Sequence, residues 1–376
     1  MPNTFAFSKN EGCGFSVFPL DNQENQMQKT RTLNFSEELR AKGLEMGLLH
    51  RLILLFILAI FLVSVFLMGY VLLGHPSFVE KDGMSVYHNR YDVSLLGDTP
   101  KGRSIKLGQQ LFDSTPKYLG PDAPAPYAGN RLSCNNCHLW SGTKPYGAPL
   151  IGIVQRFPQF SNRANKMGSL QGRINGCMLR SMNGRALPGD SKEMQALIAY
   201  MEWLGRYAPK SGKIQGQGFV AIQIPHRPVN LEKGKRVFEM HCVLCHGADG
   251  QGKMDPSGQQ YRYPPLWGAD SYNDGAGMAR TLTAANFIKG NMPFGASFQD
   301  AVLTDEEAYD VAGFINQQER PKKEDLELDY PDLRKKPVSS PYGPYADHFS
   351  MTQHQLGPFP PIITYYRNQY NLIKNQ

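Results

Sequence analysis

The chain has 376 residues, of which 41% are hydrophobic, and its formal charge is +7 at neutral pH. This length is enough for two or three domains that bury a core. The Lys and Arg residues are scattered rather than gathered in runs, which disfavours nucleic-acid binding. Attraction of anionic substrates or acidic partners fits the mild positive charge better.

The N-terminal part is predicted to hold a membrane anchor. Residues 1–51 form a polar arm, and Leu52–Leu73 contains no charged residue over a length sufficient to cross a hydrocarbon core ~30 Å thick. A cleaved signal peptide is the alternative, but the apolar run starts late and no Ala-x-Ala site follows it. Arg40, Lys42 and Arg51 precede the run, so the arm is expected in the cytoplasm.

After a linker over residues 74–100, the chain carries a Cys-x-x-Cys-His motif at Cys134, Cys137 and His138. This spacing is the attachment signal for c-type haem. Both thiols form thioethers to the porphyrin vinyls, and the adjacent His becomes the proximal iron ligand. Upstream, Gly108 and Phe112 would share one face of a helix, where Gly lets a second helix approach closely.

The sequence downstream predicts a partner helix and a distal iron ligand. Lys192–Leu204 repeats apolar residues at helical spacing after a cap at Asp190 or Ser191. The loop before this helix offers three candidates for the sixth ligand, namely Cys177, Met178 and Met182, which spacing alone does not separate. A Cys thiolate would stabilise ferric iron, whereas Met raises the potential. Cys177 could also be a buried inert thiol.

The same order of features recurs after a linker over residues 208–228. Gly234 precedes Phe238 by four residues, and a second haem motif follows at Cys242, Cys245 and His246. Thr304 and Glu307 form a capping box for a helix over Glu306–Gln317. For the distal ligand, the loop before this helix favours Met292, with Met278 second and Met254 also available.

The repeated order predicts a mainly α protein with two tandem domains like class I cytochromes c. They cover residues 101–207 and 229–319, and each binds one haem c covalently. Residues 320–376 form a tail rich in Pro and Tyr, expected to be irregular and to wrap the globular part. Because haem is attached outside the cytoplasm in bacteria, the haem domains are expected on the periplasmic side of the inner membrane.

Longer motifs give a more specific resemblance. Arg173–Cys177 and Arg180–Pro188 resemble the signature loop of dihaem thiosulfate dehydrogenases. The resemblance covers residues 100–362 and continues through Pro264–Gly268, Tyr272–Met278 and Tyr330–Leu333. This family joins two thiosulfates into tetrathionate and passes two electrons to haem, and some members run in reverse as tetrathionate reductases.

The resemblance implies roles for individual residues. Cys177 would be a thiolate ligand opposite His138 at the first, active-site haem, and Met292 would pair with His246 at the second, electron-exit haem. Arg163, Arg173 and Ser181 match positions that line the family's substrate pocket. These residue types suit dianions, because Arg offers a fixed fork of donors to an oxyanion.

Two features depart from the family pattern. The expected anchor leaves the electron partner open between a c-type cytochrome, a membrane oxidase and a quinone-linked complex. Some relatives carry a Lys beside the distal Met that competes for iron, but here that neighbour is Asn291, and Lys289 lies two residues further back. Redox-driven ligand exchange at the second haem is therefore disfavoured.

Two other functions compete with the enzyme. One is a membrane-anchored electron relay without its own substrate, and the other is a haem-bearing structural subunit of a respiratory assembly. Cys177 with its neighbouring Arg residues favours the enzyme, because a relay needs no anion pocket.

Overall fold

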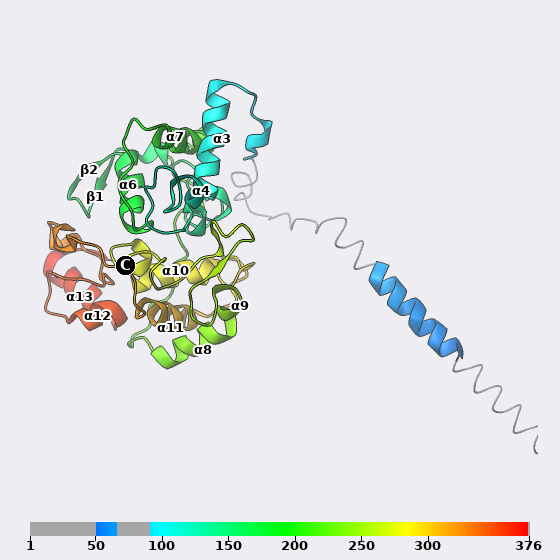
Figure 1. Cartoon of the computed structure of the whole chain (residues 1–376). Coiled ribbons are helices and arrows are strands. Elements are labelled where there is room, and N and C mark those ends of the chain that lie inside the picture. Colours follow the sequence, from blue (N-terminus) through cyan, green and yellow to red (C-terminus); the bar gives the residue numbers. More distant parts are fainter. Residues whose placement is uncertain (1–49, 66–90, 375–376) are drawn as a thin grey trace, which may run out of the picture. The chain divides into compact units, whose positions relative to one another are not determined.

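The computed structural model describes residues 50–65 and 91–374 (Figure 1). Residues 50–65 form a helix with exposed side chains. Within the described ranges, no helix is both long enough and apolar enough to cross a membrane. The rest of the expected anchor, residues 66–73, lies outside those ranges, as do most of the N-terminal arm and residues 74–90 of the linker.

The first domain is built from five helices and one hairpin among the described residues. They are α3 (Pro100–Asp113), α4 (Thr115–Leu119), α5 (Leu139–Gly142), α6 (Leu170–Arg180), α7 (Lys192–Leu204), β1 (Gln159–Ser161) and β2 (Lys166–Gly168). The predicted bounds of α7 are confirmed. Ser191 is its N-cap, and the Ser191 hydroxyl accepts a hydrogen bond from the Met194 N–H.

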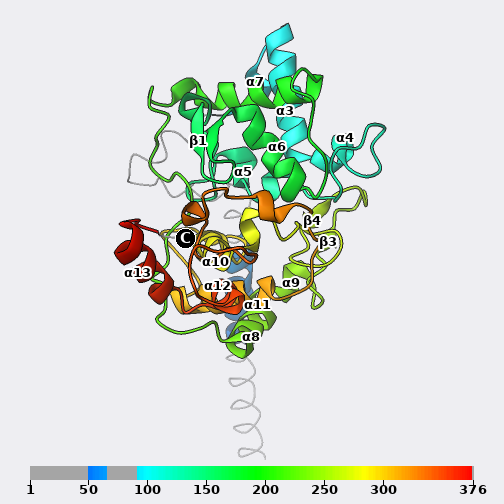
Figure 2. The ribbon, with the colours of Figure 1, turned by 90° about the vertical axis from the view of Figure 1, so that its left-hand side faces the viewer.

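The second domain repeats this plan. Its helices are α8 (Leu231–His241), α9 (Val243–His246), α10 (Thr281–Asn291) and α11 (Asp305–Asn316), and its hairpin is β3 (Lys253–Met254) with β4 (Tyr261–Tyr263). The predicted capping box at Thr304 and Glu307 is confirmed, although α11 begins at Asp305, one residue early. Figure 2 shows α3, α6 and α7 in the upper half and α8, α10 and α11 in the lower half.

Each domain contains a glycine at a helix crossing. A methyl group at Gly108 in α3 would lie 2.1 Å from the Ala196 carbonyl oxygen in α7. A methyl group at Gly234 in α8 would lie 2.2 Å from the Asp310 carbonyl oxygen in α11. The close approach predicted for Gly108 is therefore confirmed, and Gly234 permits the same close approach of α8 and α11 in the second domain.

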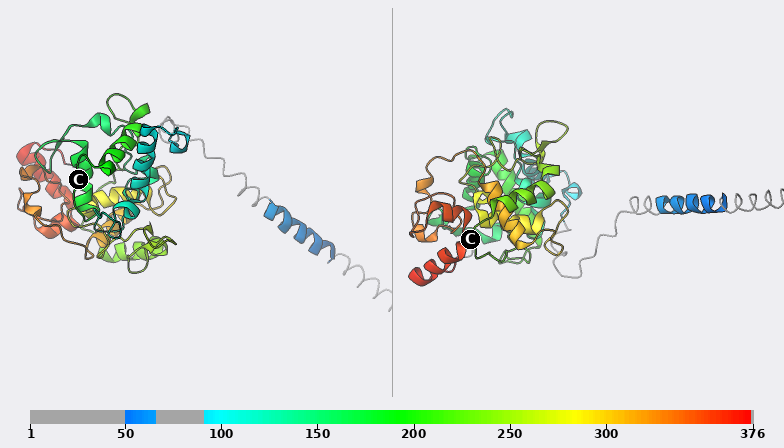
Figure 3. Two further views of the ribbon diagram at one scale, coloured as in Figure 1. Left: turned by 45° about the horizontal axis from the view of Figure 1, so that its top comes forward. Right: turned by 90° about the horizontal axis from the view of Figure 1, so that it is seen from below.

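The C-terminal tail corrects one prediction. Residues 320–376 were expected to lack regular structure, but they contain α12 (Met351–Leu356) and α13 (Phe359–Tyr370) (Figure 3). Pro360 and Pro361 lie in the first turn of α13, where a missing N–H costs no intrahelical hydrogen bond. Phe359, Ile362 and Tyr366 are buried in the core of the second domain.

Short 3-10 helices connect these elements. They are η1 (Val93–Leu95), η2 (Cys134–Asn136), η3 (Val154–Arg156), η4 (Gly205–Tyr207), η5 (Gly277–Ala279), η6 (Leu326–Leu328) and η7 (Leu333–Lys335). The tail also reaches the first domain, because the Tyr330 N–H donates to the Arg163 carbonyl and Lys335 Nζ donates to Asn165 Oδ1. It therefore packs against both haem domains.

Candidate active site

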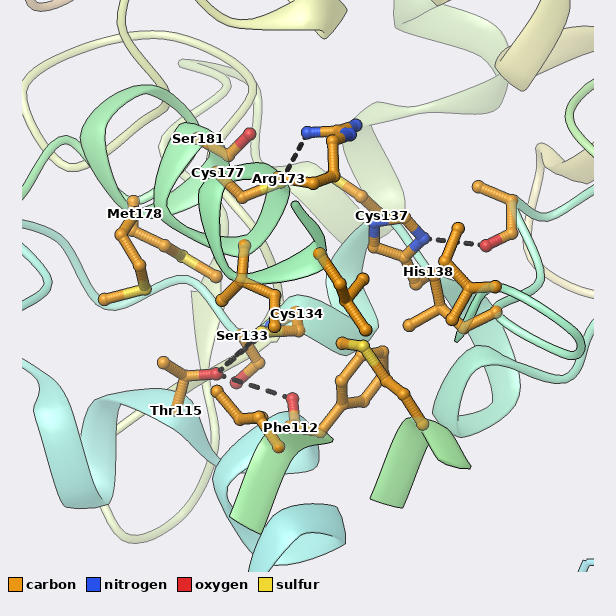
Figure 4. A pocket seen from close by; sticks show the side chains of 18 of the residues that line it. Phe112, Thr115, Ser133, Cys134, Cys137, His138, Arg173, Cys177, Met178 and Ser181 are labelled. Carbon is orange, nitrogen blue, oxygen red and sulfur yellow. Dashed lines mark hydrogen bonds between the residues drawn. The ribbon is translucent and has the colours of Figure 1, made fainter. Parts of the chain in front are cut away.

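A cavity of about 290 Å³ lies in the first domain. Apolar side chains from α3, α6 and α7 form much of its wall, including Leu111, Phe112, Ile174, Met178, Leu197 and Met201. Cys134, Cys137, His138 and Cys177 surround this cavity, and Arg173 and Ser181 line it beside Cys177 (Figure 4). The structure therefore brings together six of the residues predicted from the sequence.

Local structure holds the first haem motif in place. Ser133 is the N-cap of the short helix η2, and its N–H donates to Asn136 Oδ1 at 2.7 Å. The His138 N–H donates to the Cys134 carbonyl, which folds the motif back so that both thiols and the imidazole reach one cavity. His138 Nδ1 donates to the Ala148 carbonyl oxygen at 2.7 Å. With Nδ1 engaged in that bond, Nε2 is the nitrogen that would ligate a metal, as in most metal-ligating histidines.

Helix α6 places Cys177 and Arg173 together. The two residues are four positions apart, so they share one face of the helix. Arg173 Nη1 donates to the Cys177 sulfur at 3.1 Å. Burial raises the pKa of Cys177, but Arg173 and His138 outweigh burial and lower that pKa to about 6. Cys177 is consequently a thiolate at neutral pH, the form that binds metals and attacks sulfur.

The other two thiols of the cavity behave differently. Burial raises the pKa of Cys134 and of Cys137 to about 12 in each case. Met178 and Met182, the alternative distal ligands, also line the cavity and are almost fully buried. Cys177 is thus distinguished from its alternatives by charge rather than by position.

The second motif has the same local geometry. His246 is buried, and its Nδ1 donates to the Pro264 carbonyl oxygen at 2.7 Å. Burial lowers the pKa of His246, which keeps the ring in the neutral form that ligates metals. Cys242 and Cys245 lie at the α8–α9 junction. Met292 directly follows α10 and packs against the core of the second domain.

The alternative ligands of the second domain lie in other places. Met278 is in η5 and packs against the cores of both domains. Met254 is in β3 and is 36% exposed. Two paired thiols, a histidine oriented by a carbonyl oxygen and an apolar surrounding are the donor set that a covalently bound haem c requires, so both sites fit that cofactor.

Arg163 lies apart from the residues that line the cavity. Its Nη1 is 2.5 Å from Asp329 Oδ2 and donates to Tyr342 Oη at 3.1 Å. Arg180 pairs with the other oxygen of the same carboxylate at 2.7 Å. Burial raises the pKa of Asp329, but Arg163, Tyr342 and Arg180 together hold it below its ordinary value. In this structure Arg163 belongs to a partly buried ion cluster with Asp329 and Arg180.

Arg280 is a residue that the sequence analysis missed. Its Nη2 donates to the Tyr330 hydroxyl at 2.9 Å. Burial lowers the pKa of Arg280, and the neighbouring charges of Arg163 and Arg173 lower it further. Lys336 also lies within the electrostatic reach of Arg163 and Arg280. The structure therefore brings Arg280 into the electrostatic reach of Arg173, the residue that contacts Cys177, and no local motif marks Arg280 or Lys336.

Family models match both domains. Residues 125–209 match the SoxA/TsdA cytochrome c domain, and residues 231–319 match cytochrome c. Together with two complete haem-attachment sites on two similar helical folds, these matches define a c-type cytochrome with two haem domains. The chain carries two covalently bound haem c groups.

Curated relatives and a solved structure narrow the class. A thiosulfate dehydrogenase of Allochromatium vinosum is 42% identical over 233 residues, which cover 61% of this chain and 83% of that protein. A thiosulfate dehydrogenase of Psychrobacter arcticus is 40% identical over 241 residues, covering 64% and 71% respectively. The structure of thiosulfate dehydrogenase (TsdBA) from Marichromatium purpuratum has a TM-score of 0.58 at 33% identity, and the match covers 62% of this chain and 50% of that one. The chain belongs to the thiosulfate dehydrogenase family.

Proposed function

We propose that the protein is a thiosulfate dehydrogenase, which joins two thiosulfates into tetrathionate in the cavity of the first domain. One observation carries this proposal: the half-buried Cys177 sulfur, which accepts a hydrogen bond from Arg173, lies in the same cavity as His138 and the two attachment cysteines. Family membership supports the reaction class. The reverse reaction, tetrathionate reduction, would use the same residues.

The bound haems supply one-electron acceptors. Cys177 would hold the first iron together with His138, and its thiolate is proposed to act also as a nucleophile. Its thiolate joins the sulfane sulfur of one thiosulfate, forming Cys–S–S–SO₃⁻ and releasing two electrons. A second thiosulfate then attacks the outer sulfur of this disulfide, so that tetrathionate leaves and the thiolate returns. Atoms and charge balance in both steps.

The cationic side chains lower the repulsion between the anions. Two thiosulfate dianions and a thiolate must approach one another, and Arg173 already contacts the Cys177 sulfur. Ser181 caps α6 and lines the cavity, where its hydroxyl can donate one further hydrogen bond. Arg163 is proposed to contribute through the field it shares with Arg280 and Tyr330, because its own Nη1 is occupied by Asp329.

The second domain is proposed as the electron exit, with His246 and Met292 as iron ligands. A c-type cytochrome or a membrane oxidase would then accept the electrons. We further propose that the haem domains lie outside the cytoplasm and that residues 52–73 anchor them to the inner membrane. This location rests on the apolar run and on the compartment of haem attachment. Protease accessibility in spheroplasts tests it, since the haem domains would be digested only if they were periplasmic.

The first experiment measures thiosulfate-dependent reduction of a cytochrome or ferricyanide by the haem-loaded protein, with tetrathionate quantified and the reverse assay run alongside. Formation of one tetrathionate per two electrons supports the proposal. Absence of activity in both directions, with both haems attached, would instead favour an electron relay. Mass spectrometry of the Cys177 peptide after thiosulfate addition tests the covalent step, because an S–SO₃ adduct is expected there.

A further inference from the structure

A short segment of the first domain connects the two expected iron sites. The Ala148 carbonyl oxygen accepts from His138 Nδ1, the proximal ligand position of the first haem. Two residues earlier, the Tyr146 carbonyl oxygen accepts from Asn291 Nδ2 at 2.9 Å. Asn291 is joined directly to Met292. Residues 144–148, called here the bridging segment, therefore contact one expected iron ligand, His138, and the direct neighbour of another, Met292.

The backbone of the bridging segment is strained and firmly held. Tyr146 and Ala148 both have a φ of 54°, in the left-handed region that side chains disfavour. The Tyr146 N–H donates to the Gly216 carbonyl at 2.6 Å, and the Ala148 N–H donates to the Gly218 carbonyl at 3.0 Å. The interdomain linker thus fixes the direction in which the Tyr146 carbonyl points.

Asn291 fits this carbonyl closely. The residue is only 1% exposed, and its Nδ2 also donates to the Phe287 carbonyl oxygen at 3.0 Å. Both partners can only accept, so the amide must turn its NH₂ group towards them. Further along the loop, Lys144 Nζ donates to the Ala296 carbonyl at 2.9 Å, and the Tyr146 ring lies 4.5 Å from that of Phe298.

The lysine nearest to Met292 in sequence is engaged elsewhere. Lys289 Nζ donates to the Leu303 carbonyl at 2.7 Å and pairs with Asp305 at 3.0 Å. The first domain therefore holds the loop of residues 291–298 at both ends. Lys289 of α10 instead bonds within the second domain, to Leu303 and to Asp305 at the start of α11.

We propose that Asn291 is a positioning residue, which presents Met292 to the second iron by fastening the loop to the bridging segment of the first domain. This inference rests on the proposed role of Met292 as a ligand and adds that ligation in one domain depends on the other. Because the bridging segment also orients His138, a structural change at the first iron site would alter the position of Met292 at the second.

Asn291→Asp tests this proposal on the haem-loaded full chain. The change keeps the side chain's size but turns a carboxylate oxygen towards two carbonyl oxygens, which removes the fastening. The readouts are the Met-to-iron charge-transfer absorption of the ferric protein and the midpoint potential of the second haem. We expect loss of most of that absorption and a lower potential, because Met ligation raises it. The thiolate signature of the first haem should persist.

Asn273→Asp is the matched control. Asn273 is also 1% exposed, and its Nδ2 donates across the same domain boundary to the Leu179 carbonyl at 3.0 Å, away from Met292. This variant should keep the Met absorption. Loss in both variants would overturn the proposal, since any weakening of the domain boundary would then suffice. A wild-type spectrum in Asn291→Asp would overturn it as well.

Two further variants keep the outcomes distinct. Met292→Ala must abolish the Met absorption, and its persistence would refute the ligand assignment itself, whatever the result for tetrathionate formation. If Asn291→Asp does not fold, Asn291→Ala replaces it, because this change introduces no charge and removes the amide that donates to the Tyr146 and Phe287 carbonyl oxygens. Partial loss of the Met absorption is expected, and an unchanged spectrum would refute the positioning role.

Discussion

The crossing of α3 and α7 gives a prediction for stability. In Gly108→Ala, the new methyl group would lie 2.1 Å from the Ala196 carbonyl oxygen and 2.7 Å from Tyr200 Cβ. Both neighbours belong to the backbone or to the base of a side chain, so the helices must separate. Overpacking of this kind costs ~3 kcal/mol at the upper end of its usual range. The better helix propensity of Ala offsets ~1 kcal/mol of this cost. The free energy of unfolding of the first domain should therefore fall by about 2 kcal/mol.

The assay is urea denaturation of the haem-loaded protein, in which the free energy of unfolding of the first domain is measured. Gly172→Ala is the control in the same domain. Its methyl group would lie 3.5 Å from Ser169 Oγ, an ordinary contact, so this variant should gain ~0.5–1 kcal/mol. If Gly108→Ala were as stable as the wild type, α3 and α7 would not meet at this glycine and the argument from close approach would be wrong.

Four other predictions concern the site, a helix cap and a buried lysine. Cys177→Ala should abolish turnover in the thiosulfate assay and retain both haems, and near-normal activity would contradict a catalytic role of Cys177. Arg173→Met should lower kcat/KM ~10- to 100-fold, as expected for a lost hydrogen bond to a charged group, whereas an unchanged value would place Arg173 outside the anion site. Ser191→Ala should destabilise the first domain by ~1 kcal/mol in urea through loss of the α7 cap, and an unaltered midpoint would contradict this role. Burial lowers the pKa of Lys336 to about 8, so above that pH the unfolded chain binds more protons than the folded one. The free energy of unfolding should therefore rise with pH between 8 and 10, and it should rise less steeply in Lys336→Met. Equal slopes in the two proteins would refute the lowered pKa of Lys336.

Local patterns in the sequence determined the parts of this protein that depend on near neighbours. The haem motif works through three residues within one turn, and its two copies specified two cytochrome c domains. The caps at Ser191 and Thr304 located α7 and α11 to within a residue, because a cap bonds only to the first turn of its own helix. The pairing of Arg173 with Cys177 was not predicted, because Cys177 was expected in a loop, whereas Leu170–Arg180 forms helix α6 and places the two residues on one face.

Tertiary structure alone decided the remainder. Arg163 pairs with a carboxylate 166 positions away, so no local pattern could distinguish a cavity residue from a member of a partly buried ion cluster. Arg280 and Tyr330 meet only because the tail crosses both domains, and the tail's helix α13 forms because the core of the second domain buries its apolar face. The bond between Asn291 and Tyr146 spans 145 positions. Such contacts depend on how completed domains pack, which the spacing of residues along the chain does not encode.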